Sequence, residues 1–400
     1  MRAYAECLRQ PHVKHLVTSN IIGRLPNGMG PLVVALFLRA QGFDYALVGV
    51  LGALYGIAAA VGGPVLGRFV DLHGQARVLL LSVAASTLGF LVLSMTSPDQ
   101  VALAGVAIVV AGLFTPPLEP CLRSLWPTIL ETRRAVNAAY ALDAALQEVI
   151  FVAGPLLVVG FINGLGPAGA VVMTGVVALI GTIGFVVAPP VRRWRPEVRH
   201  ADWAGPLRSG ALRTVLLGFL FVGATLGMLN IVVVAYSEAE RSTSLSGLIL
   251  GANALGALIG GLAYGSRSWP GRAYSRLNLL MFGLAVGYLP LAFAPPPTLI
   301  LPLALISGLF LAPALACAFV VIGENVPAGT STEAFAWLVT LFMMGNGLGT
   351  SVSGAVLDRW GLATAFVGPA LAAFCGYLVL AVSRPKVRSL TAQEPDDVTS

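Results

Sequence analysis

The feature that most constrains this chain is a succession of apolar runs, most of about 20 residues or more, with short polar breaks between them. A run of this length crosses the hydrocarbon core of a bilayer as an α-helix. Charged residues make up only 10% of the chain and its mean hydropathy is +0.85, whereas soluble domains carry about 25% charged residues. A water-soluble domain, a disordered chain and a secreted disulfide scaffold are therefore excluded. The pattern predicts an all-α, multi-pass membrane protein.

Twelve apolar runs are expected to form transmembrane helices, six on each side of one long polar stretch. This division predicts a six-helix bundle at 1–190, a cytoplasmic linker at 191–210, a second six-helix bundle at 211–383 and a cytoplasmic tail at 384–400. The linker carries five arginines. The twelve runs lie near residues 15–38, 45–70, 76–96, 100–126, 135–161, 166–188, 212–237, 244–267, 274–293, 298–323, 332–357 and 362–382.

The orientation follows from the distribution of Lys and Arg. If both termini are cytoplasmic, 20 of the 24 basic residues, including Arg123, fall in segments on that side. Three (Arg39, Arg241 and Arg359) fall outside, and Arg24 lies within the first run. Cytoplasmic loops of membrane proteins carry such an excess. We therefore expect both termini to be cytoplasmic and the protein to lie in the cell membrane, and we interpret the net charge of +6 as a topology signal rather than a nucleic-acid site.

The two halves share short motifs at a nearly constant offset. Residues 112–114 read Gly-Leu-Phe and recur at 308–310, each followed by a proline and then a cysteine. Glycines at 62, 63 and 67 recur at 260, 261 and 265, and Ala-Tyr-Ala at 139–141 corresponds to Ala-Phe-Ala at 334–336. Three matches in order predict two pseudo-symmetric bundles related by an axis along the membrane normal.

The connection between the second and third runs carries a motif at 67–77 formed by Gly67, Arg68, Asp71, Gly74 and Arg77. It resembles the G-x-x-x-D-x-x-G-x-x-R signature of the major facilitator superfamily, whose twelve-helix layout matches the whole chain. The resemblance implies a conformational latch in which Asp71 faces the positive end of the helix that begins near Thr332, which is electrostatically favourable. Arg77 would pair with Asp71 or Glu131.

The second half departs from this signature, because the position equivalent to Asp71 is Trp269. We therefore expect the latch to be one-sided. Gly154-Pro155 followed by Gly160 is similar in part to a motif of the efflux-type drug:proton antiporters of the same superfamily. A Pro kink or close helix packing explains these residues equally well. The arginine that those antiporters carry in their fourth helix is replaced here by Ile108.

Three ionisable residues, Arg24, Glu119 and Asp143, are predicted at similar depth inside the first half. Such residues are expensive in a membrane and indicate a functional site by default. The second half has Phe219, Leu315 and Leu338 at the equivalent positions, which favours a functional role over a structural ion pair. Because two carboxylates would share one guanidinium, one of them is expected to carry a proton. Asp143 is preferred, because Arg123 at i+4 gives Glu119 a second partner. Gln147 and Glu148 are further candidates for the coupling site.

Aromatic and amide side chains are candidates for a substrate cavity, with core packing and interhelical hydrogen bonds as the alternatives. The candidate lining residues are Phe114, Tyr140, Asn230, Asn253, Phe310, Phe335, Trp337 and Asn346.

The predicted function is secondary active transport by alternating access, in which proton coupling drives efflux of a small apolar or amphipathic compound. A sugar or metabolite permease is the alternative, and a membrane-embedded enzyme or receptor is more remote. The chain has no Walker A motif, and its four cysteines form no C-x-x-C pair. We expect no cofactor and no metal. The expected partners are a small-molecule substrate, protons and the bilayer, with the protein monomeric.

Overall fold

A computed structural model describes residues 2–196, 205–242, 245–267, 269 and 271–383. Within these residues all regular secondary structure is helical. Parts of the predicted linker (197–204) and the predicted tail (384–400) lie outside the described residues. The elements are α1(Arg2–Arg9), α2(Val13–Ala40), α3(Tyr45–His73), α4(Gln75–Ser94), α5(Val101–Leu113), α6(Leu118–Ile129), α7(Arg133–Val187), α8(Pro189–Arg193), η1(Gly205–Arg208), α9(Gly210–Ala239), α10(Leu245–Gly265), α11(Ala273–Tyr288), η2(Leu289–Phe293), α12(Pro297–Gly308), α13(Leu311–Asn325), α14(Ser331–Ala365) and α15(Val367–Val382).

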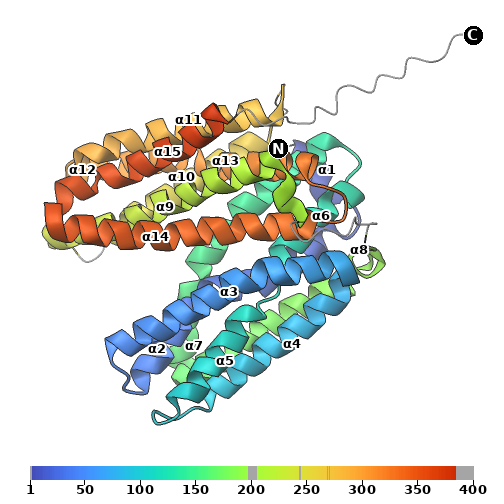
Figure 1. The fold of residues 1–400 in the computed structure, drawn as a ribbon, viewed down its shortest axis with the longest axis horizontal. Helices are drawn as coiled ribbons and strands as arrows, with labels where there is room; N and C mark the ends of the chain where they lie inside the picture. The colour runs from blue at the N-terminus through green and yellow to red at the C-terminus, as the bar shows by residue number, and fades with distance from the viewer. Residues whose placement is uncertain (1, 197–204, 243–244, 268, 270, 384–400) are drawn as a thin grey trace, which may run out of the picture.

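The helices form two neighbouring sets. Figure 1 shows α2, α3, α4 and α5 on one side and α9 to α15 on the other, with the N-terminal α1 and α6 at the end where both sets come together. The first half of the chain is held by contacts of α2 and α4 with α7, and the second half by contacts of α14 and α15 with α9. Contacts of α3 with α14, and of α7 with α10 and α13, join the two sets.

Two of the predicted apolar runs are interrupted by a break in the helix. The run predicted near 100–126 is divided into α5 and α6 by residues Phe114–Pro117, where two successive prolines remove backbone N–H donors. The run near 298–323 is divided into α12 and α13 at Leu309 and Phe310, shortly before Pro313. Each break falls at the repeated Gly-Leu-Phe motif. The first break starts a new helix, α6, inside the span.

Glycines break two other long helices. Within α7, Gly166 has a φ of 74° and a ψ of 173°, which is not helical, and Pro167 follows it. Within α14, Gly361 has a φ of 77° and a ψ of 179°. Only glycine adopts this backbone conformation without strain. The chain therefore turns at these two residues although the hydrogen-bonding pattern continues on both sides.

Glycines also allow helices to touch backbone to backbone. A Cβ atom added to Gly62 of α3 would collide with the carbonyl of Leu113, and one added to Gly260 of α10 would collide with the carbonyl of Leu309. The α9–α14 contact is of the same kind and involves Gly223, Gly227, Gly345 and Gly349. Small residues at such contacts are typical of membrane helix packing, where close approach supplies the attraction.

The outer faces of the helices are apolar. Leu81, Leu156 and Leu279 are each exposed by more than 65%, and many similar side chains are exposed by more than a third. In water such a large apolar surface would promote aggregation, whereas in a bilayer it contacts the lipid acyl chains. Among the described residues, ten helical segments are long and apolar enough to cross a membrane, and α15 is a shorter apolar helix. The protein is therefore of the multi-pass membrane type.

Candidate functional site

The Asp71 carboxylate joins the two halves of the chain. It accepts hydrogen bonds from the backbone N–H groups of Thr332 (3.2 Å) and Glu333 (2.9 Å), in the first turn of α14. These donors have no partner within their own helix, and the helix dipole favours a negative charge there. Asp71 is almost fully buried, so the contact is shielded from water. We call the contact of Asp71 with the start of α14 the latch.

The structure explains why both positions of the latch motif, Gly67 and Gly74, are glycine. A Cβ atom at Gly67 would lie 3.1 Å from the Cα of Glu333, so its absence lets α3 approach α14 closely. Gly74 has a φ of 92° and turns the chain from α3 into α4. Arg68 is half-buried beside Gly67. The proposed pairing of Arg77 is wrong, because its side chain is exposed and forms no ion pair within the described part of the chain.

A closed ring of four charges lies inside the first half. The guanidinium of Arg24 contacts Asp143 (Nη1–Oδ1, 2.5 Å) and Glu119 (Nη2–Oε2, 3.1 Å). Arg123 contacts the other oxygens of the same two carboxylates, with an Nε–Oδ2 distance of 2.7 Å to Asp143. We call these four residues the charge ring. Each is at most 6% exposed, so opposite charges must compensate one another there.

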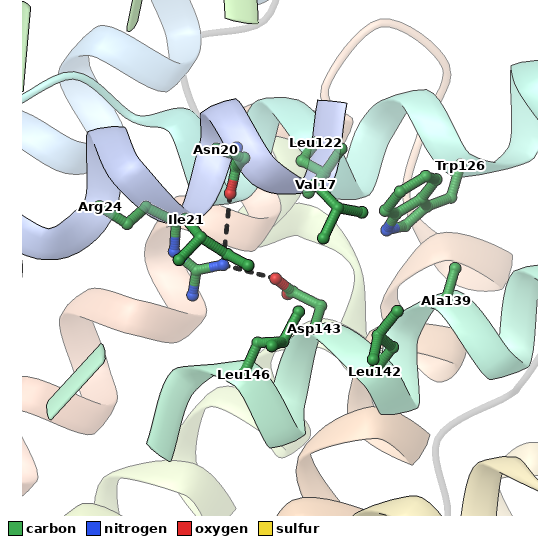
Figure 2. Close-up of a pocket in the computed structure, with 10 residues that line it drawn as sticks. All are labelled: Val17, Asn20, Ile21, Arg24, Leu122, Trp126, Ala139, Leu142, Asp143 and Leu146. Carbon is green, nitrogen blue, oxygen red and sulfur yellow. Dashed lines mark hydrogen bonds and ion pairs between the residues drawn. The ribbon is translucent and has the colours of Figure 1, made fainter. Parts of the chain in front are cut away.

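Three helices hold the charge ring together. Arg24 comes from α2 and Asp143 from α7, and their contact appears in Figure 2. Glu119 and Arg123 lie one turn apart on α6, and Glu119 sits in the first turn after the break, where the helix dipole favours a carboxylate. The break in the apolar run therefore places the acid at a helix N-terminus within the span. Gln147 also accepts a hydrogen bond from Arg24.

The choice of Asp143 as the proton carrier assumed that Arg123 is a partner of Glu119 alone, whereas Arg123 contacts both acids. Sequence reasoning assigned Arg123 to the cytoplasmic side, but its side chain is fully buried and stacks over the ring of Phe319, 3.5 Å from the centroid. Two guanidinium groups therefore compensate two carboxylates. Asp143 contacts both arginines, so the argument that it must carry a proton no longer holds. The missing signal was the charge balance itself, since two buried acids require two cations.

The latch lies close to the charge ring. Ser124, the neighbour of Arg123 on α6, contacts the Thr332 hydroxyl at 3.3 Å between the side-chain oxygens. Gln75, at the start of α4, donates to the Ser124 hydroxyl (3.0 Å) and to the Cys121 carbonyl (3.1 Å). Helix α6 therefore connects the N-terminus of α14 to the charge ring through direct contacts.

A small void adjoins the charge ring. Figure 2 shows it between α2, α6 and α7, lined by Arg24, Asp143 and Asn20 on one side and by apolar side chains and Trp126 on the other. Its volume is about 10 Å³, enough for no more than one water molecule. This void is too small to be a substrate site.

A second cavity, of about 560 Å³, lies between the two halves and has the size of a small-molecule site. We call it the central cavity. Its first-half wall carries the polar residues Glu119, Arg123, Gln147 and Glu148. Its second-half wall is mainly apolar and includes Leu315 and Leu338, the positions equivalent to Glu119 and Asp143. The cavity therefore has one charged wall and one apolar wall.

Glu148 is the exception among the charges of the central cavity. Glu119 and Arg123 belong to the charge ring, whereas Glu148 forms no ion pair or side-chain hydrogen bond within the described residues. Its side chain is half-buried on α7, one residue after Gln147. A carboxylate at membrane depth without a cation is costly, and such residues mark ion or substrate pathways.

Of the residues predicted to line a substrate cavity, the amides do so and the aromatic residues do not. The three amides Asn230, Asn253 and Asn346 all line the central cavity. The five predicted aromatic residues are not among its lining residues: Tyr140 and Phe335 pack with Phe319 in a buried cluster, and Phe114, Phe310 and Trp337 pack against the core. The aromatic residues that do line it, Phe151, Phe319 and Phe342, were not predicted.

Sequence comparisons agree with the latch motif. The profile of the Major Facilitator Superfamily matches residues 19–303. An uncharacterized MFS-type transporter, y4rN, from Sinorhizobium fredii is 26% identical over 175 residues, which are 42% of each chain. Solute carrier family 22 member 18 from Rattus norvegicus is 37% identical over 81 residues, 20% of this chain and 19% of that protein. The matches thus span less than half the length of these relatives.

Solved structures share the fold over nearly the whole chain. The human organic anion transporter MFSD10 (TETRAN) superposes with a TM-score of 0.72 at 16% identity, covering 93% of this chain and all of that one. A bacterial homologue of the iron transporter ferroportin, in its outward-facing state, superposes with a TM-score of 0.75 at 14% identity, covering 92% and 98%. Since the family profile covers well over half of the sequence, this chain belongs to the major facilitator superfamily.

Proposed function

We propose that this protein is a secondary transporter that works by alternating access and couples proton entry to efflux of a small amphipathic compound. One observation carries the proposal. The central cavity lies between the two halves and exposes a single carboxylate, Glu148, that no cation compensates within the described residues. The latch closes one end of the interface between the halves, and its release would open that end.

We further propose twelve membrane crossings in two pseudo-symmetric six-helix bundles. Helix α7 has 55 residues, about 80 Å of helix, which is more than twice the hydrocarbon thickness of about 30 Å. With the break at Gly166 it would cross twice, and α15 after the turn at Gly361 would add the last crossing. The equivalent contacts of Gly62 with Leu113 and of Gly260 with Leu309 support the repeat.

The proposed topology has bundles at 1–190 and 211–383, joined by a linker at 191–210 and followed by a tail at 384–400, with both termini cytoplasmic in the cell membrane. The latch end is then the cytoplasmic end. Removing Arg123 from the cytoplasmic count leaves 19 basic residues against three, so the orientation argument is unaffected. We propose that the transport unit is a monomer, because the central cavity is formed by one chain.

Glu148 replaces Asp143 as the proposed proton carrier. Asp143 accepts from Arg24 and Arg123 together, so protonating it would leave two buried guanidinium groups with one carboxylate between them. Protonating Glu148 breaks no ion pair and removes an uncompensated charge. Glu148 is therefore the acid that can take up a proton without leaving a buried cation undercompensated.

The proposed function is tested in inverted membrane vesicles with a fluorescent pH-gradient indicator. Addition of ethidium, a small amphipathic probe, should partly dissipate the gradient in vesicles that contain the wild-type protein. Glu148→Gln should abolish this response, whereas Glu131→Gln, which neutralises an exposed carboxylate, should leave it unchanged. A full response from Glu148→Gln would contradict proton coupling at this residue.

A sugar or metabolite permease is the second candidate, and the amide groups favour it. Asn230, Asn253, Asn346 and Gln147 line the central cavity and could hydrogen-bond hydroxyl groups. Counterflow of radiolabelled sugars in proteoliposomes, with no pH dependence, would support this candidate over the first. The large apolar second-half wall, which offers a sugar little, is the reason that we place it second.

A further inference from the structure

The walls of the central cavity carry one net negative charge. Of the charge ring, Glu119 and Arg123 line the cavity and cancel each other, Arg24 and Asp143 cancel each other outside its lining, and Glu148 adds one carboxylate. Building on the proposed transport function, we propose that the substrate is an amphipathic organic cation, whose charged end pairs with Glu148 and whose apolar body packs against the second-half wall.

In the described part of the chain, the groups around Glu148 supply no competing cation. Arg123 lies in the same wall, but its Nη2 pairs with Glu119, its Nε pairs with Asp143, and Phe319 covers the guanidinium. Its remaining nitrogen, Nη1, has no hydrogen-bond partner in the described residues but is buried. Tyr288 of α11 lies close enough to Glu148 for an electrostatic interaction and is neutral when its hydroxyl is protonated. An anionic ligand would therefore place a second negative charge beside Glu148 without meeting an available cation.

The neutral polar groups are compatible with a cation. The Nδ2 of Asn253 is already directed at three acceptors: the Ser307 hydroxyl (2.9 Å), the Tyr288 hydroxyl (3.1 Å) and the Ala304 carbonyl (3.3 Å). The group that Asn253 can offer a ligand in the cavity is therefore its carbonyl oxygen, which is an acceptor. On the opposite wall, the Gln147 oxygen accepts from Arg24, and its second lone pair remains an acceptor beside the amide N–H donors.

The apolar lining suits the body of such a ligand. Phe151, Phe319 and Phe342 line the cavity together with leucines and Met343. Aromatic faces attract organic cations in addition to burying apolar surface, and they do not attract anions in this way. The charge of Glu148 and the aromatic lining therefore select the same class of ligand.

The same carboxylate explains how a cation would exchange with a proton. When the cavity is closed to water, a bare Glu148 carboxylate is expensive, so the closed states are those in which it holds a proton or pairs with the cation. The two occupants exclude each other because they neutralise the same charge. Competition at one group is sufficient for antiport.

The inference is tested by equilibrium binding of two ions of similar size and opposite charge. Tetraphenylphosphonium and tetraphenylborate are measured on the purified full-length protein in detergent, above neutral pH. The wild-type protein should bind tetraphenylphosphonium at least about tenfold more tightly than tetraphenylborate, since one uncompensated charge in a low-dielectric site supplies that much discrimination. Glu148→Gln should remove most of this preference, and Glu148→Asp, which keeps the charge, should retain it.

Equal binding of the two ions by the wild-type protein, or binding of neither, would overturn the inference, as would a preference that persists in Glu148→Gln. Wild-type binding is informative even if the variants fail to fold. The assay requires no gradient and no turnover. Selective cation binding without gradient-driven transport would therefore overturn the proposed proton coupling and leave this inference intact.

Discussion

The latch gives the most direct test of the structure. In Asp71→Asn, one carboxylate oxygen becomes an NH₂ group that faces a backbone N–H of α14 instead of accepting from it. The variant loses one charge-assisted hydrogen bond and the interaction of a negative charge with the helix N-terminus, about 2–3 kcal/mol together. This is a shift of about 30- to 150-fold in the ratio of closed to open latch.

The assay is a distance measurement between spin labels on the two sides of the latch. Arg77 and Ala328 are both exposed and suitable for labelling, and Cys375, the one native cysteine that is not buried, is first replaced by alanine. Asp71→Asn should move much of the distance distribution to longer values. Glu131→Gln removes an exposed carboxylate from the same end of the molecule and serves as the control. Identical distributions in both variants would refute the reasoning, because the carboxylate would then not hold the halves together.

Three further predictions concern stability and reactivity. Asp143→Asn leaves two buried guanidinium groups undercompensated and should destabilise the protein by about 3–5 kcal/mol, measured as a lower thermal unfolding temperature in detergent. Gly260→Leu should prevent folding, because the new side chain would collide with the carbonyl of Leu309. The control Gly49→Leu meets open space and should yield folded protein. Similar yields of the two variants after size-exclusion chromatography would contradict this packing. Burial raises the pKa of Cys7 to about 11, so maleimide labelling of a Cys7-only variant should stay slow at neutral pH and accelerate only on unfolding; rapid labelling of the folded protein would contradict this.

Much of the fold could be predicted because apolar length is a local property of the sequence. The run expected at 15–38 forms α2(Val13–Ala40), and the run expected at 212–237 forms α9(Gly210–Ala239). The latch was predicted through the resemblance to the major facilitator superfamily, which implies that Asp71 faces the helix that begins near Thr332, and the contact is present. The break between α5 and α6 was not predicted, although Pro116 and Pro117 lie in it.

The candidate site was less predictable because burial depends on which helices meet. The depth of Arg24, Glu119 and Asp143 along their runs suggested that they cluster, whereas Arg123, near the end of a run, has the sequence position of an aqueous residue. The prediction of aromatic residues in the cavity lining failed for the same reason. A phenylalanine packs equally well between helices or against a cavity, so only the tertiary arrangement separates Phe335 from Phe342.

The zero net charge of the charge ring has an electrical consequence. Moving one elementary charge through a membrane potential of 100 mV involves about 2.3 kcal/mol of work, but four charges that sum to zero and move together contribute none. Among the residues that the structure describes, Glu148 is the one further charged residue that lines the central cavity, and it is neutral both with a proton and when paired with a monovalent cation. Neither half of the proposed cycle then carries current, so the exchange would be electroneutral, driven by the pH gradient alone and indifferent to the voltage across the membrane.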